Sequence, residues 1–305
     1  MCETIKKFGM GWLPDYPDLR DYTIEQDEVP LKLRNLGQKD SVKTMLKKVG
    51  ITPKLTAGPP SAIDLRQWCP PVEDQGDLGS CTANAGVALV EYFERKALGK
   101  HIDASRIFLY KATRNLMRTT GDTGAFIRTT MGALVLFGVP PEEYWPYKIG
   151  DFDKEPTAFC YSFAQNYQAI SYYRLDPPGT SGEALLKRIK TWLAAGLPSM
   201  FGFTVYSSIH QAGTTGKIPY PTRGEQVLGG HAVAAVGYDD KMKIKNTNPN
   251  GVETKGALLI RNSWGEDWGD KGYGWLPYEY VLQGLADDWW SLLRNEWVDA
   301  GVFRV

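Results

Sequence analysis

One cysteine stands where a nucleophile could be activated. Cys81 follows the stretch QGDLGS and opens an apolar run that continues to Gly99, a pattern that predicts a core helix beginning at the cysteine. A thiol attacks a carbonyl carbon only as the thiolate, a minor species for an ordinary cysteine at neutral pH. The N–H groups and the dipole of a helix N-terminus stabilise an anion there. A buried, inert thiol is the alternative, so the choice depends on a partner base.

Three histidines are available as that base. His101 lies in LGKHIDASR, which is typical of a solvated junction between a helix and a loop. His210 follows an expected strand and begins a polar loop. His231, in GGHAVAAVGY, lies behind two glycines at the start of an apolar strand, so the backbone holds the ring and leaves it approachable. We predict that His231 is the base; a histidine that only fills the core is the alternative.

An imidazole also needs a partner that fixes its tautomer and ring plane. Asn262 ends the apolar stretch GALLIRN and is followed by Ser263, Trp264 and glycine turns. Its amide oxygen can accept from the ring N–H without adding charge, and the indole can keep water from that bond. An asparagine that merely fills a turn at a strand end is the alternative.

Taken together, the stretches QGDLGSC, GGHAVAAVGY and RNSWGEDWGDKGYG resemble the three catalytic motifs of the papain-like cysteine peptidases. The spacing agrees, with 150 residues from Cys81 to His231 and 31 from His231 to Asn262. DLR at 64–66 and the aromatic PPEEYWPY match as well, so the resemblance covers roughly residues 62–280. It implies a papain-like α+β fold, in which a helical domain and a β-barrel-like domain meet at an active-site cleft.

The resemblance also implies a role for each matching residue. Cys81 would be the nucleophile, and His231 would be its proton partner and later the acid for the leaving amine. Asn262 would orient His231, and Trp264 would shield that contact. The substrate would be a polypeptide, cut through a thioester, and neither a metal nor an organic cofactor is expected.

Three further residues are expected to support the site. Gln75 matches the glutamine that shares the oxyanion hole with the backbone N–H of Cys81. Gly124, in GDTGAF, matches the glycine along which substrate backbone forms hydrogen bonds, and Gly230 leaves His231 open to approach. A plain turn residue is the alternative for Gln75 and for Gly124.

The chain departs from the family at the nucleophile. Leu78 and Thr82 stand where animal and plant members usually have a cysteine and a tryptophan, and Gly121 stands where the first cysteine would find its disulfide partner. Both ends of that bridge are missing together, which favours a disulfide-free version suited to reducing conditions. Thr82 alters the expected wall of the cleft, so subsite preference does not carry over. The other cysteines are then expected to be ordinary thiols: Cys2, Cys69 and Cys160.

The elements that must position these residues fall into three parts. We expect an N-terminal arm over 1–60, a helical domain over 61–170 and a β-rich domain over 171–305. Apolar periodicity predicts helices over 126–138 and 182–195. The stretches PSMFGFTVY, HAVAAVGY and GALLIRNSW read as strands, the last two joined by a polar hairpin that turns at Asn250-Gly251.

The arm lacks the longer helical prodomain of many relatives. DSVKTMLKKVG predicts one short amphipathic helix, and TPKLTAGPPS at 52–61 is a connector. The aromatic, proline-rich run at 9–23 could lie extended through the cleft, so we hypothesise that the arm restrains activity until it is removed or displaced. A strap packed on the back of the domain is the alternative. The mature start would align near Pro59-Pro60; cleavage nearer 54–56, or none, is equally compatible.

Bulk composition excludes several functions. The 305 residues carry no net charge and are 43% hydrophobic, so nothing favours nucleic acid or an acidic membrane as a partner. No apolar stretch reaches the length of a membrane helix, and no C-x-x-C pair suggests zinc. With no signal peptide visible, we expect a monomer that is cytoplasmic as synthesised, with leaderless export open.

Two other functions remain compatible with the same residues. The triad could transfer the acyl group to an amine instead of water, as a ligase or transglutaminase does. Alternatively, the chain could be a non-catalytic peptide-binding module, against which stands the joint presence of Gln75, Cys81, His231 and Asn262.

Overall fold

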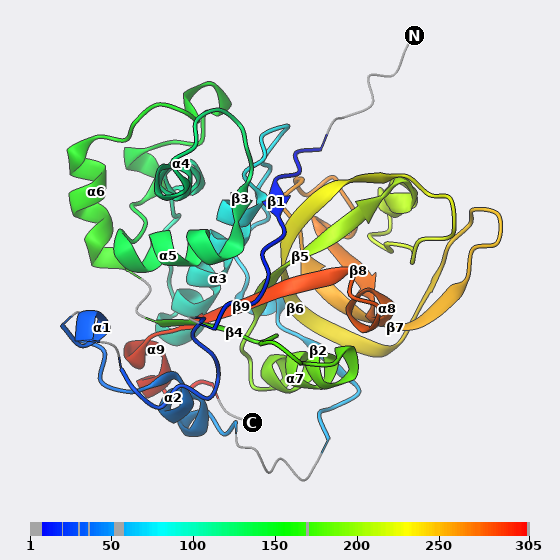
Figure 1. The fold of residues 1–305 in the computed structure, drawn as a ribbon, viewed down its shortest axis with the longest axis horizontal. Coiled ribbons are helices and arrows are strands. Elements are labelled where there is room, and N and C mark those ends of the chain that lie inside the picture. The colour runs from blue at the N-terminus through cyan, green and yellow to red at the C-terminus, as the bar shows by residue number, and fades with distance from the viewer. Residues whose placement is uncertain are drawn as a thin grey trace.

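The computed structural model describes residues 8–19, 21–29, 31–35, 37–51, 58–168 and 171–303. Most helices gather in one half of the molecule and most strands in the other, and the arm runs between the halves (Figure 1). The helices are α1 (Leu31–Asn35), α2 (Val42–Lys48), α3 (Cys81–Leu98), α4 (Arg106–Met117), α5 (Ile127–Leu136), α6 (Ala158–Ala164), α7 (Gly182–Ala194), α8 (Tyr278–Leu282) and α9 (Asn295–Asp299). The strands are β1 (Trp12–Leu13), β2 (Ala62–Asp64), β3 (Ala125–Phe126), β4 (Ser171–Arg174), β5 (Ser199–Tyr206), β6 (Val227–Lys245), β7 (Glu253–Arg261), β8 (Tyr273–Pro277) and β9 (Ala286–Leu293).

The helical half is built around α3, as the apolar run predicted. This helix begins at Cys81, is buried as far as Glu94, and ends at Gly99, whose φ of 73° is left-handed. It contacts α4 and α5 on one side and β6 on another, so it belongs to both halves. The predicted helices over 126–138 and 182–195 are confirmed as α5 and α7.

The β-rich half is one sheet with the order β4-β9-β5-β6-β7-β8, and β2 pairs with β6. These neighbours are antiparallel, and the long strand β6 lies between β5 and β7. The predicted hairpin joins β6 to β7, where Lys245 pairs with Glu253 and Asn250 takes a left-handed φ of 63°. The α+β class is confirmed. Over the described residues the sheet does not close into a complete barrel, and β4 and β8 lie at its ends.

The arm contains the predicted helix, which is α2. Ser41 caps it by accepting a hydrogen bond from the N–H of Thr44, and its apolar side packs inward, with Met45 fully buried. The expectation of a single helix is wrong, because the arm also forms α1 and the short strand β1. Helix α1 has five residues, LKLRN, too few to give an apolar stripe. The cleavage positions considered at 54–56, and Cys2, lie outside the described residues.

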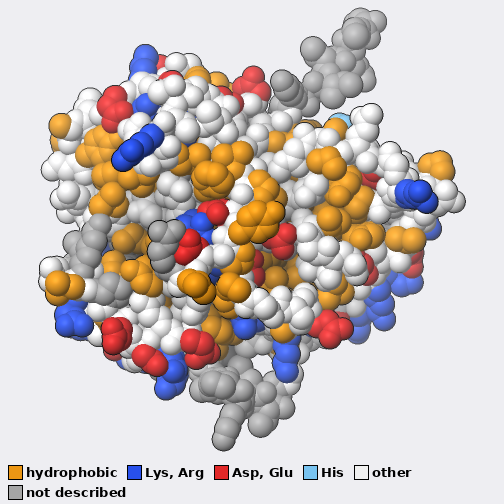
Figure 2. Space-filling model, in the orientation of Figure 1, with side chains coloured by type: hydrophobic (Ala, Val, Ile, Leu, Met, Phe, Trp, Pro, Cys, Tyr) orange, Lys and Arg blue, Asp and Glu red, His pale blue; other side chains and the backbone are white. Residues whose placement is uncertain are grey.

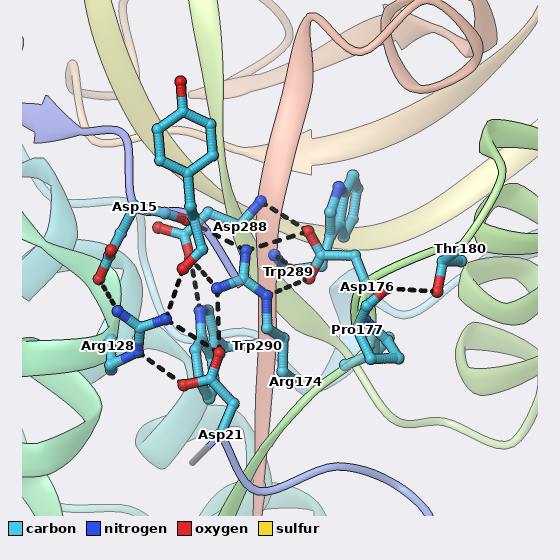
Figure 3. Close-up of polar contacts among 12 residues, drawn as sticks. Asp15, Asp21, Arg128, Arg174, Asp176, Pro177, Thr180, Asp288, Trp289 and Trp290 are labelled. Carbon is cyan, nitrogen blue, oxygen red and sulfur yellow. Dashed lines mark hydrogen bonds and ion pairs between the residues drawn. The ribbon is translucent and has the colours of Figure 1, made fainter. Parts of the chain in front are cut away.

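A network of ion pairs ties the arm to both halves (Figure 3). Asp15 and Asp21 of the arm pair with Arg128 on α5, and Asp21 also pairs with Arg174 at the end of β4. Arg174 is 1% exposed and lies 2.9 Å from Asp176 as well. The arm is therefore bound to the helical half and to the sheet at one place.

On the outside, hydrophobic side chains gather near the middle of the face seen in Figure 1, interspersed with charged ones (Figure 2). Two of the most exposed large hydrophobic residues belong to the arm, Tyr16 at 88% and Leu19 at 97%. Within the described ranges, no helix has the length and apolarity needed to cross a membrane.

Candidate active site

Cys81 is the first residue of α3 and is completely buried. Burial raises the pKa of its thiol to about 11, although hydrogen bonding to the backbone of Ala232, Gly11 and Thr82 acts in the opposite direction. The helix N-terminus was expected to favour the thiolate. In this state desolvation outweighs it, and the sulfur is held as a neutral thiol.

His231 lies on β6, opposite Phe203 of β5, and is also completely buried. Its Nε2 lies 2.7 Å from the Oδ1 of Asn262. Burial lowers the pKa of His231 to about 4, against the opposing effect of that hydrogen bond, so the ring is neutral near pH 7. With the Nε2–H donated to Asn262, Nδ1 is an acceptor, and it has no hydrogen-bond partner among the described residues. Strand β6, which carries His231, packs against α3, which begins with Cys81.

Asn262 directly follows β7 and holds its side chain by a second contact, since its Oδ1 accepts from the N–H of Ser263 at 2.8 Å. Trp264 lies flat on the imidazole of His231, with ring centroids 4.4 Å apart and planes inclined by 24°. Trp264 is 1% exposed. The indole therefore covers the ring that Asn262 orients, which is the arrangement expected of a shield.

Gln75 is fully buried and is held by Ser263. The Gln75 N–H donates to the Ser263 carbonyl at 2.8 Å, and the Ser263 hydroxyl donates to Gln75 Oε1 at 2.5 Å. This leaves the Gln75 amide nitrogen to donate to Leu78 O at 2.7 Å and to Gly9 O at 3.2 Å. Ser263 is thus a positioning residue that sequence reasoning missed; its place directly after Asn262 was the available signal.

Gly124 and Gly230 leave room for backbone of the arm. A Cβ on Gly124 would lie 2.3 Å from Gly11 O, and a Cβ on Gly230 would lie 2.6 Å from Trp12 O. Gly124 also has a left-handed φ of 71°. Beside it, the Ala125 N–H donates to Gly11 O at 2.8 Å. Both glycines therefore border the path of a polypeptide.

That polypeptide is segment 8–13 of the arm. Phe8 stacks on Trp264 with centroids 4.5 Å apart. Gly9 O accepts from Trp264 Nε1 at 3.2 Å, and the Gly9 N–H donates to Gly76 O at 2.9 Å. From Phe8 to Trp12 the segment touches residues of both halves, including those predicted to be catalytic.

The loop before the cysteine is fixed by a pair that the sequence did not reveal. Asp122 accepts from the N–H of Gly79 at 3.0 Å and from the hydroxyl of Tyr110 at 2.5 Å. The same hydroxyl accepts from the N–H of Gly124 at 3.1 Å. Asp122 lies within the GDTG stretch, two residues before Gly124, so its position was a signal.

The remaining candidates lie elsewhere. His101 follows α3, and His210 is exposed on a 3₁₀ turn at Ser207–Ala212. Cys69 and Cys160 are buried free thiols. In the part of the chain that the structure describes, no three His, Cys, Asp or Glu side chains cluster as metal ligands would.

Comparison with known proteins agrees with this geometry. The family model of the papain family cysteine protease matches residues 59–285. An uncharacterised peptidase C1-like protein of Acanthamoeba polyphaga mimivirus is 33% identical over 93% of this chain and 86% of its own length. Cathepsin B-like CP3 of Giardia intestinalis is 30% identical over 70% of this chain and 68% of its own.

Among solved structures, xylellain, a cysteine protease from Xylella fastidiosa, superposes with a TM-score of 0.70 at 34% identity. The match covers 95% of this chain and 98% of that one. The family match spans the loop of Gln75, the helix of Cys81, the strand that carries His231, and Asn262 directly after β7. The chain therefore belongs to the papain family and is a papain-like cysteine peptidase.

Proposed function

We propose that Cys81, His231 and Asn262 together cleave peptide bonds of a polypeptide. The observation that carries this is the orientation of His231, whose Nε2 is bound to Asn262 while its Nδ1 is left as an acceptor, on the strand that packs against the helix of Cys81. Nδ1 takes the thiol proton as the sulfur bonds to the carbonyl carbon. The C–N bond then breaks and the amine leaves with that proton. Water, deprotonated by the same nitrogen, hydrolyses the thioester and releases the acid and the free thiol.

We further propose that segment 8–13 restrains this chemistry. Its contacts with Gln75, Trp264 and Ala125 use groups that a substrate would need. Burial raises the pKa of the Cys81 thiol and lowers that of His231, and segment 8–13 contributes to the cover over this region. Displacement of the segment would restore solvent and substrate access together.

A single methyl group tests this restraint. In Gly11→Ala the new Cβ would lie 2.0 Å from the carbonyl oxygen of Gly79, a backbone atom that cannot move aside. Overpacking of this kind costs about 1–3 kcal/mol, so we expect the full-length variant to hydrolyse a peptide roughly 10- to 100-fold faster than the parent chain. Initial rates with a short fluorogenic peptide measure the effect.

Gly58→Ala is the matched control, because a Cβ there meets nothing within 4 Å and the same arm stays in place. A point substitution is preferable to a chain that starts near Pro59, since α2 contributes Met45, which is fully buried, to the core. Equal rates for the parent and both variants, with Cys81 intact, would end the idea of restraint.

Gln75 is proposed to hold the developing oxyanion together with the backbone N–H of Cys81. The support is that its amide nitrogen already donates to a peptide oxygen, that of Gly9. In the Gly11→Ala background, Gln75→Ala is expected to lower kcat by about 10²–10³. Ser263→Ala keeps the amide but frees it to rotate, so a smaller loss is expected. A kcat unchanged by Gln75→Ala would leave Gln75 as a turn residue.

A further inference from the structure

The side chain of Trp12 fills a fitted space beside the catalytic residues. Trp12 is 6% exposed. A Cβ on Gly202 of β5 would lie 1.9 Å from the indole, and a Cβ on Gly230 of β6 would lie 2.9 Å from it. Only glycine at both strand positions leaves room for the ring. A cavity of about 430 Å³ adjoins Trp12.

The end of this space is a buried carboxylate, Asp288 on β9, which is 0% exposed. Its Oδ2 accepts from the indole N–H of Trp12 at 3.2 Å. Its Oδ1 accepts from the indole N–H of Trp290 at 2.7 Å and lies 3.2 Å from Arg174 (Figure 3). The oxygen that faces the space therefore has the Trp12 N–H as a donor, while the other oxygen has donors of its own.

The backbone of Asp288 takes a left-handed φ of 64°, a conformation that aspartate and asparagine tolerate better than most residues. In this conformation its carboxylate faces a space lined by two glycines.

The space lies next to the reacting atoms. A Cβ on Gly11 would lie 2.0 Å from the carbonyl oxygen of Gly79, two residues before Cys81, and the Gly11 carbonyl accepts from the N–H of Ala125. Trp12 is the next residue, and its carbonyl passes over Gly230, which precedes His231. A side chain in this space therefore belongs to a residue adjacent to the one that faces the nucleophile.

This inference rests on the proposed function. We propose that the space now filled by Trp12 is the side-chain specificity pocket of the peptidase and that Asp288 makes it select tryptophan in the substrate. An indole fills the room between the two glycines and donates to Asp288 Oδ2. Phenylalanine or leucine would leave that buried oxygen without a donor, which is the situation that discriminates most strongly between similar side chains. Arginine would add a second cation to a carboxylate that Arg174 already pairs.

Asp288→Asn tests the role of the oxygen at nearly constant shape, and asparagine tolerates a left-handed φ. Trp290 donates a hydrogen bond to the Oδ1 position and the Arg174 guanidinium lies 3.2 Å from it, so both favour the amide oxygen at that position. The amide nitrogen then occupies the Oδ2 position and meets the indole N–H as a second donor. The change should therefore penalise tryptophan substrates and spare phenylalanine substrates.

The experiment uses the full chain with Trp12→Ala, which empties the pocket. Peptides that differ only in Trp, Phe, Leu or Arg, placed in turn on each side of the scissile bond, are compared by kcat/KM. At one position next to the attacked residue, we expect tryptophan to exceed phenylalanine on the order of 10- to 100-fold. With Asp288→Asn added, this ratio should fall to near one while the phenylalanine rate stays within about threefold. Asp287→Asn, at the exposed neighbouring carboxylate, is the control that keeps the ratio.

The outcomes separate this inference from the function on which it rests. Hydrolysis without a preference for tryptophan, or a preference that survives Asp288→Asn, overturns the pocket and leaves the peptidase. No hydrolysis of any peptide, with Cys81 unreactive toward an epoxide inhibitor, overturns both.

A second measurement, the rate at which an epoxide labels Cys81, requires neither peptide hydrolysis nor the Trp12→Ala variant. In the otherwise native chain, Trp12→Phe and Asp288→Asn should each speed epoxide labelling of Cys81 by a similar factor, and the double variant should add no more. Independent effects of the two changes would show that the indole and the carboxylate do not act as one contact, and would overturn the inference.

Discussion

Replacing Cys81 by alanine is expected to abolish peptide hydrolysis while the protein keeps its fold. Loss of the covalent nucleophile in a catalytic unit of this kind lowers kcat on the order of 10⁵–10⁶-fold. The substitution removes one sulfur atom at the start of α3, so the thermal midpoint should change little. The rate is measured in the Gly11→Ala background, where turnover is expected to be fastest, and folding is followed by circular dichroism.

Cys69→Ala is the matched control for that experiment. Cys69 is also a buried free thiol, but it lies against Leu65 O, away from His231. Its removal should leave kcat unchanged. Residual hydrolysis by Cys81→Ala, lost instead on removal of Cys69 or Cys160, would contradict the assignment of the nucleophile.

Removal of Arg174 is expected to cause a large loss of stability. Arg174 is 1% exposed and pairs with Asp21, Asp176 and Asp288, at 3.5, 2.9 and 3.2 Å. Arg174→Met leaves these buried carboxylates without their shared cation, a change that typically costs about 3–5 kcal/mol. The free energy of unfolding from urea titration at pH 7 measures it.

The loss should shrink as the pH falls. Burial raises the pKa of Asp288 from 3.8 to about 6 even with Arg174 present, and Arg174 acts to lower it. The folded state therefore binds a proton before the unfolded state does, so the contribution of Asp288 to stability increases as pH falls from about 6 toward 3.8. Without Arg174 this effect is larger, so the deficit should be greatest above pH 6 and smaller near pH 5.

Lys243→Met is the control for Arg174. Lys243 pairs with Glu253 at 3.0 Å, but the two side chains are 64% and 49% exposed. Pairs of that kind contribute about 0–1 kcal/mol. Similar losses for the two variants would show that the network of Arg174 does not hold the arm and the sheet together.

The positions of the residues proposed to be catalytic could be predicted from the sequence because each lies in a stretch whose secondary structure is determined by its own residues. Cys81 opens a helix that its own apolar run specifies, and Asn262 follows a strand that its own residues specify. The positioning roles were missed because they depend on contacts between distant residues. Ser263 bonds the side chain of Gln75 across 188 positions of sequence, and no local pattern records that.

The short elements of the arm and the closure of the sheet could not be predicted from the sequence. Helix α1 has only five residues. Strand β1 has only two, and it is a strand because those residues pair with β3. Whether a sheet closes depends on its two end strands, and alternation within one strand says nothing of that. The neutral state of Cys81 likewise depends on burial to which residues 8–13 contribute, which the chemistry of the helix start did not reveal.

The anchoring of α2 has a consequence for the kinetics of the restraint that we propose for segment 8–13. Met45 is wholly enclosed, and Asn295 of α9 donates to Asp40 at 2.6 Å, so the root of the arm is part of the folded body. When segment 8–13 dissociates from the site, it stays covalently joined to this anchored part of the arm, at an effective concentration that dilution does not alter. Dissociation and rebinding of the segment are then unimolecular. The equilibrium between them shifts only when a competitor occupies the site, the segment itself is changed, or the chain that joins it to the body is cut.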